Sequence, residues 1–391
     1  MFAPLLICLL VLLALGGAER LARDRAWREV PVRIHVNGTR AKSTLTRLIW
    51  SALCEAGVPA LAKTTGTAAR LLLPDRREEP VRRRGPANIR EQLECMRYAR
   101  RLGARAVVVE CMALDPTLQY VSEREIVRAT IGVITNVRFD HTDVMGRTLP
   151  SIAATLANTI PSGGTLVTGA QEFAQLFRDR ASRLGTRVVV VEPDGESEGG
   201  GNGAGHERWV AEDTALALGV TRELGIDDTV ARRGFARAPL DPGAVRYGAV
   251  SLAGGDAAWT DASAANDPDS LALLLAGFQP WNGTRATGGG GRSRILVFNH
   301  RSDRVPRLLC FAERCAAFTS ADHLVITGCR PPLTLWGQLA RLREPKGAEF
   351  VPSRGLATWL AAHAPGATLA FCGNTRGLDV PRLLEEAASR D

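Results

Sequence analysis

Lysine is nearly absent from this chain of 391 residues. Only Lys42, Lys63 and Lys346 occur among its 49 basic residues, so arginine supplies almost all of the positive charge. Arginine cannot replace lysine where a compact, strongly hydrated ammonium must fit among phosphate oxygens. The few lysines that remain are therefore candidates for ligand contacts.

Aromatic residues are also scarce, at 5% of the chain. The net charge of +8 would suit a nucleic acid, a membrane surface or an acidic substrate. Stacking on bases needs aromatic side chains, so we expect no nucleic-acid partner. The densest arginine run, at residues 76–84, is either a solvated loop or a docking patch for a polyanion or anionic lipid.

None of the eight cysteines forms a C-x-x-C pair. Their spacing matches neither a zinc site nor the disulfide framework of a small secreted domain. We therefore expect reduced thiols, mostly in apolar cores, in a protein that faces the cytosol.

Charge is missing from residues 2–18, which are dominated by Leu, Ile, Val and Ala. This stretch is at the short limit for a membrane-spanning helix. Arginines follow it and none precedes it, which places the basic flank in the cytoplasm and differs from a secretory signal. We expect residues 1–22 to be a single anchor in the cell membrane, with the remaining chain in the cytoplasm. A signal cleaved near Gly16-Gly17-Ala18 is the alternative.

Strand and helix patterns alternate from residue 30 onwards, which predicts an α/β fold with a mostly parallel sheet covered on both faces. We expect a central domain at 23–240 and a smaller, Rossmann-like α/β domain at 241–391. The expected strands of the two domains are 30–36, 106–111, 132–137, 165–168 and 188–192, then 295–299, 323–327 and 368–372. The expected helices include 42–56, 88–102 and 151–158, and the glycine-rich stretches 195–205 and 286–292 are predicted to be loops.

The strand ending at Val36 leads into Asn-Gly-Thr-Arg-Ala-Lys-Ser-Thr and then into an amphipathic helix. This layout is typical of a nucleotide phosphate site, where backbone N–H groups face the phosphates, Lys42 adds charge and Ser43 binds Mg²⁺. The full Walker pattern is absent because Val36 and Ala41 occupy its glycine positions, so an ordinary turn is the alternative. The candidate nucleotide-binding residues here are Gly38, Thr39, Arg40, Ala41, Lys42, Ser43 and Thr44.

Two further strings extend the candidate site. Residues 63–67, Lys-Thr-Thr-Gly-Thr, suit a phosphate or carboxylate, or alternatively form a capped turn. Glu110 and His141 follow successive buried strands, where α/β sheets place ligand groups. Both side chains could therefore reach a metal ion beside the phosphate loop.

Together these strings resemble the Mur ligase superfamily, which includes folylpolyglutamate synthase, and more narrowly the poly-γ-glutamate synthase catalytic subunits of the PgsB/CapB type. The strings that carry the resemblance are His-Val-Asn-Gly-Thr-Arg at 35–40, Lys-Ser-Thr at 42–44, Lys-Thr-Thr-Gly-Thr at 63–67, Glu-Cys-Met at 110–112, Ile-Thr-Asn-Val-Arg at 134–138 and Asp-His at 140–141. The C-terminal half adds an Asp261…Asn266-Asp-Pro string, Asn-His-Arg-Ser-Asp-Arg at 299–304 and Gly373-Asn374.

The resemblance implies ATP and Mg²⁺, with glutamate joined through γ-amide bonds by way of an acyl phosphate. It implies that Lys42, Glu110, His141 and Arg246 are catalytic, that Ser43, Glu110 and His141 bind the metal, and that Asn136, Arg246, Asp261 and Asn266 join the loop in binding ATP. It assigns glutamate carboxylates to Lys63, Thr64, Thr65, Arg301 and Arg304. Taken alone, Arg301 and Asp303 would be interpreted as an ion pair at a helix start.

The resemblance also implies partners: glutamate, the growing poly-γ-glutamate, the membrane, and small integral-membrane and export subunits of a capsule synthase. A homo-oligomer is left open. The sequence departs from the Mur pattern at Ala41, in the absence of a lysine from 151–158, where a carbamylated lysine is usual, and in lacking room for a substrate domain before residue 32. Two alternatives remain: another Mur or folylpolyglutamate-type ligase, or a nucleotide-binding subunit without catalytic activity.

Overall fold

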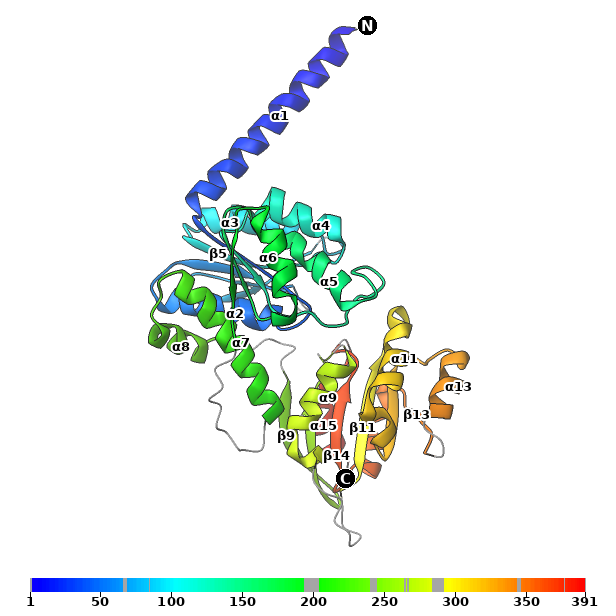
Figure 1. The fold of residues 1–391 in the computed structure, drawn as a ribbon. Coiled ribbons are helices and arrows are strands. Elements are labelled where there is room, and N and C mark those ends of the chain that lie inside the picture. Colours follow the sequence, from blue (N-terminus) through cyan, green and yellow to red (C-terminus); the bar gives the residue numbers. More distant parts are fainter. Residues whose placement is uncertain are drawn as a thin grey trace. The chain divides into compact units, whose positions relative to one another are not determined.

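The computed structural model describes residues 2–65, 69–83, 85–192, 204–239, 245–263, 265, 267–282, 292–342, 346–375 and 377–390. The chain divides into two compact units (Figure 1). The first unit contains residues 1–194 and 212–241, and the second contains residues 195–211 and 242–391. Both expected glycine-rich loops lie largely outside the described residues. The first was predicted two residues too long, because Ala204 already begins a helix.

An eight-stranded sheet forms the centre of the first unit. Its strands are β1 (Val32–Asn37), β2 (Ala60–Lys63), β3 (Arg70–Leu72), β4 (Glu78–Pro80), β5 (Ala106–Glu110), β6 (Ile131–Ile134), β7 (Thr165–Thr168) and β8 (Arg187–Val190). They lie in the order β4-β3-β2-β5-β1-β6-β7-β8. All pairings are parallel except β2–β3 and β3–β4, so the prediction of a mostly parallel sheet is confirmed.

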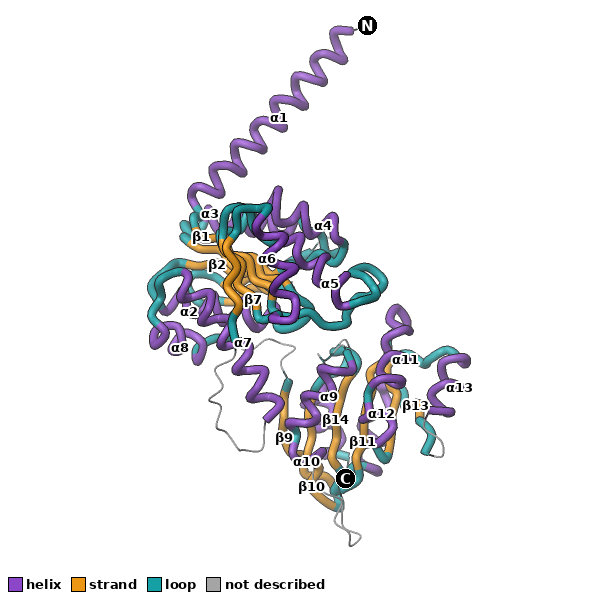
Figure 2. Tube along the Cα trace, viewed as in Figure 1, coloured by secondary structure: helices purple, strands orange, loops and turns teal. Residues whose placement is uncertain are grey.

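Helices cover both faces of this sheet (Figure 2). The helices of the first unit are α1 (Phe2–Glu29), which covers the sheet only at its end, α2 (Lys42–Glu55), α3 (Arg90–Arg101), α4 (Pro116–Val121) with a π-helical turn (Ser122–Val127), α5 (Leu149–Leu156) with a 3₁₀ turn (Ala157–Thr159), α6 (Ala174–Ser182) preceded by a 3₁₀ turn (Gln171–Phe173), α7 (Ala204–Glu223) from residue 212 onwards, and α8 (Asp228–Ala236). Alternate strand residues point to opposite faces. Val108 therefore packs with Ile49 of α2, whereas Val107 and Val109 pack with Met96 of α3.

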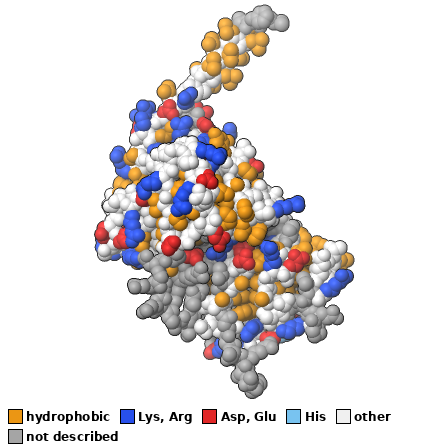
Figure 3. Space-filling model, viewed as in Figure 1, with side chains coloured by type: hydrophobic (Ala, Val, Ile, Leu, Met, Phe, Trp, Pro, Cys, Tyr) orange, Lys and Arg blue, Asp and Glu red, His pale blue; other side chains and the backbone are white. Residues whose placement is uncertain are grey.

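Helix α1 runs without a break for 28 residues and extends away from the first unit (Figure 1). Its apolar side chains are exposed along the helix (Figure 3). The window Pro4–Leu21 has a mean hydropathy of 1.9 and is long and apolar enough to cross a membrane. The other end of α1 is docked on the sheet unit, where the Trp27 indole N–H donates to the Ile126 carbonyl at 3.0 Å.

A six-stranded sheet forms the centre of the second unit. Its strands are β9 (Arg246–Leu252), β10 (Gly255–Asp261), β11 (Arg294–His300), β12 (His323–Gly328), β13 (Glu349–Phe350) and β14 (Thr368–Cys372), in the order β13-β12-β11-β14-β10-β9. Only β9 is antiparallel to its neighbour. The expected α/β architecture of this half is confirmed.

Two helical layers also enclose the second sheet. The helices are α9 (Pro268–Gly277), α10 (Gln279–Asn282), α11 (Val305–Arg314) after a 3₁₀ turn (Ser302–Arg304), α12 (Ala316–Ser320), α13 (Leu333–Leu342), α14 (Ser353–His363) and α15 (Val380–Ala388). Phe298 packs against Phe311 and Phe318 on one face, with ring centroids 5.4 and 5.5 Å away. Val297 and Phe371 face α14 and α15 on the other.

Candidate active site

Three neighbouring parallel strands, β5, β1 and β6, end at one edge of the first sheet. In their register, Val36 lies beside Glu110, and Asn37 lies beside Ile134. The carboxyl edge of a parallel sheet is where α/β proteins bind ligands. The candidate residues that follow each strand in the sequence are therefore brought to one place.

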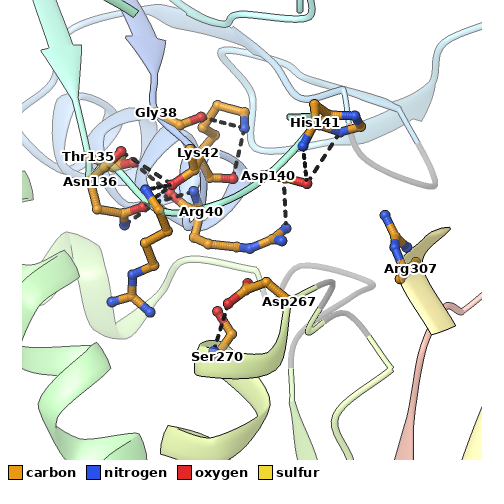
Figure 4. A network of polar contacts seen from close by, with 12 residues as sticks. Gly38, Arg40, Lys42, Thr135, Asn136, Asp140, His141, Asp267, Ser270 and Arg307 are labelled. Carbon is orange, nitrogen blue, oxygen red and sulfur yellow. Dashed lines mark hydrogen bonds and ion pairs between the residues drawn. The ribbon is translucent and has the colours of Figure 1, made fainter. Parts of the chain in front are cut away.

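The loop after β1 is clamped by the residues that follow β6 (Figure 4). The Thr135 hydroxyl donates to the Arg40 carbonyl at 2.6 Å. The Asn136 side-chain oxygen accepts from the Thr39 hydroxyl at 2.7 Å and from the Arg40 N–H at 3.0 Å. Asn136, which the sequence placed among the nucleotide-binding residues, thus stabilises the loop through these two hydrogen bonds.

Gly38 is required by this clamp. Its φ is 131°, and a Cβ there would lie 1.9 Å from the Thr135 hydroxyl oxygen. Ala41 also has a left-handed backbone, with φ 63°, although it carries a methyl group. Left-handed conformations are costly for residues other than glycine, so the sequence departure at Ala41 coincides with local backbone strain.

Helix α2 begins at Lys42 and has no side-chain cap at its N-terminus. The first N–H groups of a helix have no partners within the helix, and a phosphate satisfies them well. The Lys42 ammonium donates to the carbonyls of Gly38 and Thr39 at 2.8 and 3.3 Å, which holds it over the loop (Figure 4). It also lines a small cavity with Asn37, Cys111, Leu114, Asp140, His141 and Met145.

Ser43 and Glu110 form the candidate metal-binding pair. The Ser43 hydroxyl donates to the Glu110 carboxylate at 2.8 Å, and the same carboxylate oxygen accepts from the Thr65 N–H at 2.7 Å. Among the described residues, no group of three or more His, Cys, Asp or Glu could hold a metal. Mg²⁺ commonly takes one or two protein oxygens together with phosphate and water oxygens, so these two oxygen donors fit such an ion.

His141 and Arg40 lie on either side of Asp140. The Asp140 carboxylate is 3.4 Å from the Arg40 guanidinium and 3.7 Å from the His141 imidazole. His141 has a positive φ of 46° and lines the same cavity as Lys42. The structure thus brings His141 to the phosphate loop, on the Lys42 side.

Lys63, at the end of β2, is buried and lies 3.0 Å from the Glu91 carboxylate. Burial by itself raises the pKa of Glu91, but Arg83 and Lys63 outweigh it and hold that pKa below its usual range. The sequence did not reveal Glu91 and Arg83 as partners because they belong to a distant segment. The Thr64 hydroxyl accepts from the Arg70 N–H at 3.2 Å, while Gly66 and Thr67 lie outside the described residues.

The second unit places its candidate residues at two positions. Arg246 and Asp261 face each other in the antiparallel β9–β10 register, and Asn266 lies outside the described residues. Arg301 forms an ion pair with Asp303 at 2.6 Å, as the alternative interpretation of that string proposed. Arg304 ends the following 3₁₀ turn, and its side chain is outside the described set.

Sequence reasoning missed the residues that support the loop from within the core. The Asn37 amide donates to the Gln119 side chain at 2.9 Å and to the Thr159 hydroxyl at 3.0 Å. Asn37 could have been suspected from its place directly before Gly38. Gln119 carries no local signal, because its role depends on the packing of α4 against the sheet.

Comparisons with known proteins agree with this architecture. Residues 249–386 match the family model described as the poly-gamma-glutamate synthase CapB C-terminal domain. The chain is 38% identical over 328 residues to PGA synthase CapB of Bacillus subtilis, covering 83% of this chain and 81% of that protein. It is 35% identical over 326 residues to the capsule biosynthesis protein CapB of Bacillus anthracis, covering 82% and 68%.

Solved structures give the same fold at lower sequence identity. A bifunctional folylpolyglutamate synthase/dihydrofolate synthase with Mn, AMPPNP and L-glutamate bound superposes with a TM-score of 0.59 at 18% identity, covering 90% of this chain and 89% of that one. MurF from Acinetobacter baumannii gives a TM-score of 0.62 at 13% identity, covering 95% and 79%. The chain therefore belongs to the poly-γ-glutamate synthase CapB family, and it is an ATP-dependent amide ligase with the fold of the Mur ligases and folylpolyglutamate synthases.

Proposed function

We propose that this chain polymerises glutamate through γ-amide bonds at the expense of ATP. The observation that carries the proposal is the phosphate loop at the end of β1, where Lys42, the uncapped start of α2 and the Ser43–Glu110 pair meet. Such a site neutralises and positions phosphates. Membership of the CapB family indicates glutamate as the acid to be activated.

A carboxylate cannot form an amide in water without activation. In the proposed reaction, a glutamate carboxylate attacks the γ-phosphate of ATP, which gives an acyl phosphate and ADP. The amine of another glutamate then displaces phosphate to form the amide. Lys42 would bind the β- and γ-phosphates, and the N–H groups from Gly38 to Thr44 would surround them.

Ser43 and Glu110 would hold Mg²⁺, which would neutralise charge on the phosphate oxygens when bound. His141 would contact the metal or the substrate from the Lys42 side. Because residues 151–158 contain no lysine, the proposal includes no second metal held by a carbamylated lysine.

We assign the remaining candidate residues as follows. Arg246, Asp261 and Asn266 would contact ATP. Lys63, Thr64, Thr65, Arg301 and Arg304 would bind glutamate carboxylates. For Lys63 and Arg301 this assignment requires exchange of partners, because Glu91 and Asp303 already neutralise them.

We further propose that α1 anchors the chain in the cell membrane with both units in the cytoplasm. The basic flank after Leu21 supports this orientation. The growing polymer, small integral-membrane subunits and export subunits would then meet the enzyme at the membrane, and self-association would be compatible with this arrangement. The division into domains at 1–22, 23–240 and 241–391 is part of the same proposal.

Phosphate release from ATP tests the proposal. Membranes that contain the full chain should release phosphate faster when glutamate is added, and mass spectrometry should find products spaced by one glutamyl residue with γ-linkages. Products with a single added amino acid would instead indicate a non-polymerising ligase of the same fold. Phosphate release that is indifferent to glutamate would contradict the proposal.

A further inference from the structure

The segment formed by α4 and its π-helical turn buries polar side chains against the sheet. Gln119, Ser122 and Glu123 are 0%, 0% and 1% exposed. Their spacing of three and four residues places them on one face of the segment. Burial of polar groups is unfavourable unless each is hydrogen-bonded, and an apolar face would pack there without that requirement.

Each of these side chains reaches toward a strand that carries the candidate site. The Glu123 carboxylate contacts the His35 imidazole at 2.8 Å. The Ser122 hydroxyl donates to Gln92, whose amide lies 3.5 Å from the Glu110 carbonyl oxygen. The polar face therefore connects to β1 and to the end of β5, the two strands that lead into the phosphate loop and the metal-binding pair.

The contact between Gln119 and Asn37 lies closest to the loop. Both N–H groups of the Asn37 amide are used, one by Gln119 and one by Thr159. Gln119 is itself oriented by a 3.2 Å hydrogen bond from its amide to the Leu114 carbonyl. Asn37 is 2% exposed and precedes Gly38 directly, so a displacement of Asn37 would be passed to the loop.

We propose that Gln119 is a positioning residue for nucleotide binding, because its hydrogen bond to Asn37 fixes the start of the phosphate loop. This inference rests on the proposed nucleotide role of that loop. It assigns to the buried polar face of α4 a function in the alignment of Gly38 and Lys42, which an apolar face could not perform.

Affinity for a non-hydrolysable ATP analogue with Mg²⁺ tests the inference in the full chain. Gln119→Leu should raise the dissociation constant about three- to tenfold, the effect of one lost buried hydrogen bond. If Gln119→Leu folds poorly, Gln119→Asn withdraws the oxygen by one methylene and provides the same test.

Thr186→Val is the matched control, since it removes a buried 2.6 Å hydrogen bond to the Pro161 carbonyl elsewhere in the first unit. It should lower the melting temperature without changing affinity. Equal affinity of wild type and Gln119→Leu, together with a lowered melting temperature, would overturn the positioning role. Lys42→Ala separates the two proposals. If Lys42→Ala leaves the affinity for the analogue unchanged, the proposed nucleotide site is wrong. If Lys42→Ala weakens binding and Gln119→Leu does not, only the role of Gln119 fails.

Discussion

The hydroxyl of Ser43 donates a 2.8 Å hydrogen bond to the carboxylate of Glu110, although 67 positions separate the two residues. The first turn of α2 and the end of β5 therefore bring a hydroxyl oxygen and a carboxylate side by side. This hydrogen bond connects the loop after β1 to the end of the neighbouring strand β5 without a metal ion.

Loss of a ligand oxygen at either residue should weaken metal binding, so the reaction should need more Mg²⁺. We expect Glu110→Gln and Ser43→Ala to raise the Mg²⁺ concentration for half-maximal phosphate release by at least about tenfold. Glu94→Gln, at an exposed position of α3, is the control. An unchanged Mg²⁺ titration in Glu110→Gln would remove Glu110 from the site.

Replacement of Lys42 should lower activity even when arginine takes its place. The bulkier, planar guanidinium does not reproduce an ammonium that fits between loop carbonyls and phosphates. Lys42→Arg and Lys42→Ala should each lower glutamate-dependent phosphate release by about 10²- to 10³-fold, the usual effect of removing a group that stabilises developing charge. Lys346→Arg, at a partly exposed position in the second unit, should be silent. Full polymer synthesis by Lys42→Ala would contradict the site assignment.

The two left-handed positions of the loop should respond in opposite ways to exchange of alanine and glycine. Gly38→Ala would place a Cβ against Thr135 and should lower the free energy of unfolding and abolish nucleotide binding. Ala41→Gly relieves a φ of 63° and should raise the free energy of unfolding by up to about 1 kcal/mol. Urea unfolding of both variants measures this, and a destabilised Ala41→Gly would show that the methyl group contributes packing.

The buried His35 should make stability depend on pH in the alkaline range. Burial lowers the pKa of this imidazole, but its interactions with Cys111 and Glu123 outweigh burial and raise it to about 10. Because this lies above the unfolded value of about 6.5, the stabilisation is complete below that pH and is lost as pH rises through about 10. Chemical unfolding between pH 6 and 10 should show a declining free energy of unfolding. Glu123→Gln should flatten that decline, and a parallel slope in the variant would count against the pair.

Removal of residues 2–18 should release the chain from membranes. Both units keep their own cores, so glutamate-dependent phosphate release should persist in the soluble fraction. Fractionation followed by the phosphate assay checks both parts. A truncated chain that still sediments with membranes would locate the attachment elsewhere.

Local patterns were sufficient to predict the sheet and the loop. The strand at 165–168, the strand at 368–372 and the helix start at Lys42 agree with the structure because each is bounded by clear turn residues. The sequence also placed Glu110 and Ser43 at adjoining strand and helix ends. Such placement follows from parallel topology alone, since the carboxyl ends of the strands share an edge.

Long-range pairings could not be predicted in the same way. Lys63 was expected to be available for a ligand, but its ammonium lies against Glu91, a partner selected by the packing of α3. The β3–β4 extension was missed because its strands are three residues each and include charged side chains. Gln119 looks like an ordinary helical residue until α4 is placed against β1.

The unbroken α1 helix has a consequence for distance. Leu21, where the apolar window ends, and Glu29, where the helix ends, are eight positions apart, which is a rise of about 12 Å along the axis. Trp27 fixes this part of the helix to the first unit, so the connection between the apolar window and the first unit is rigid. Under the proposed anchoring, the phosphate loop would work at a nearly constant height above the bilayer. Each new amide bond would then form at the same distance from the bilayer, and a partner that receives the polymer could bind at that distance.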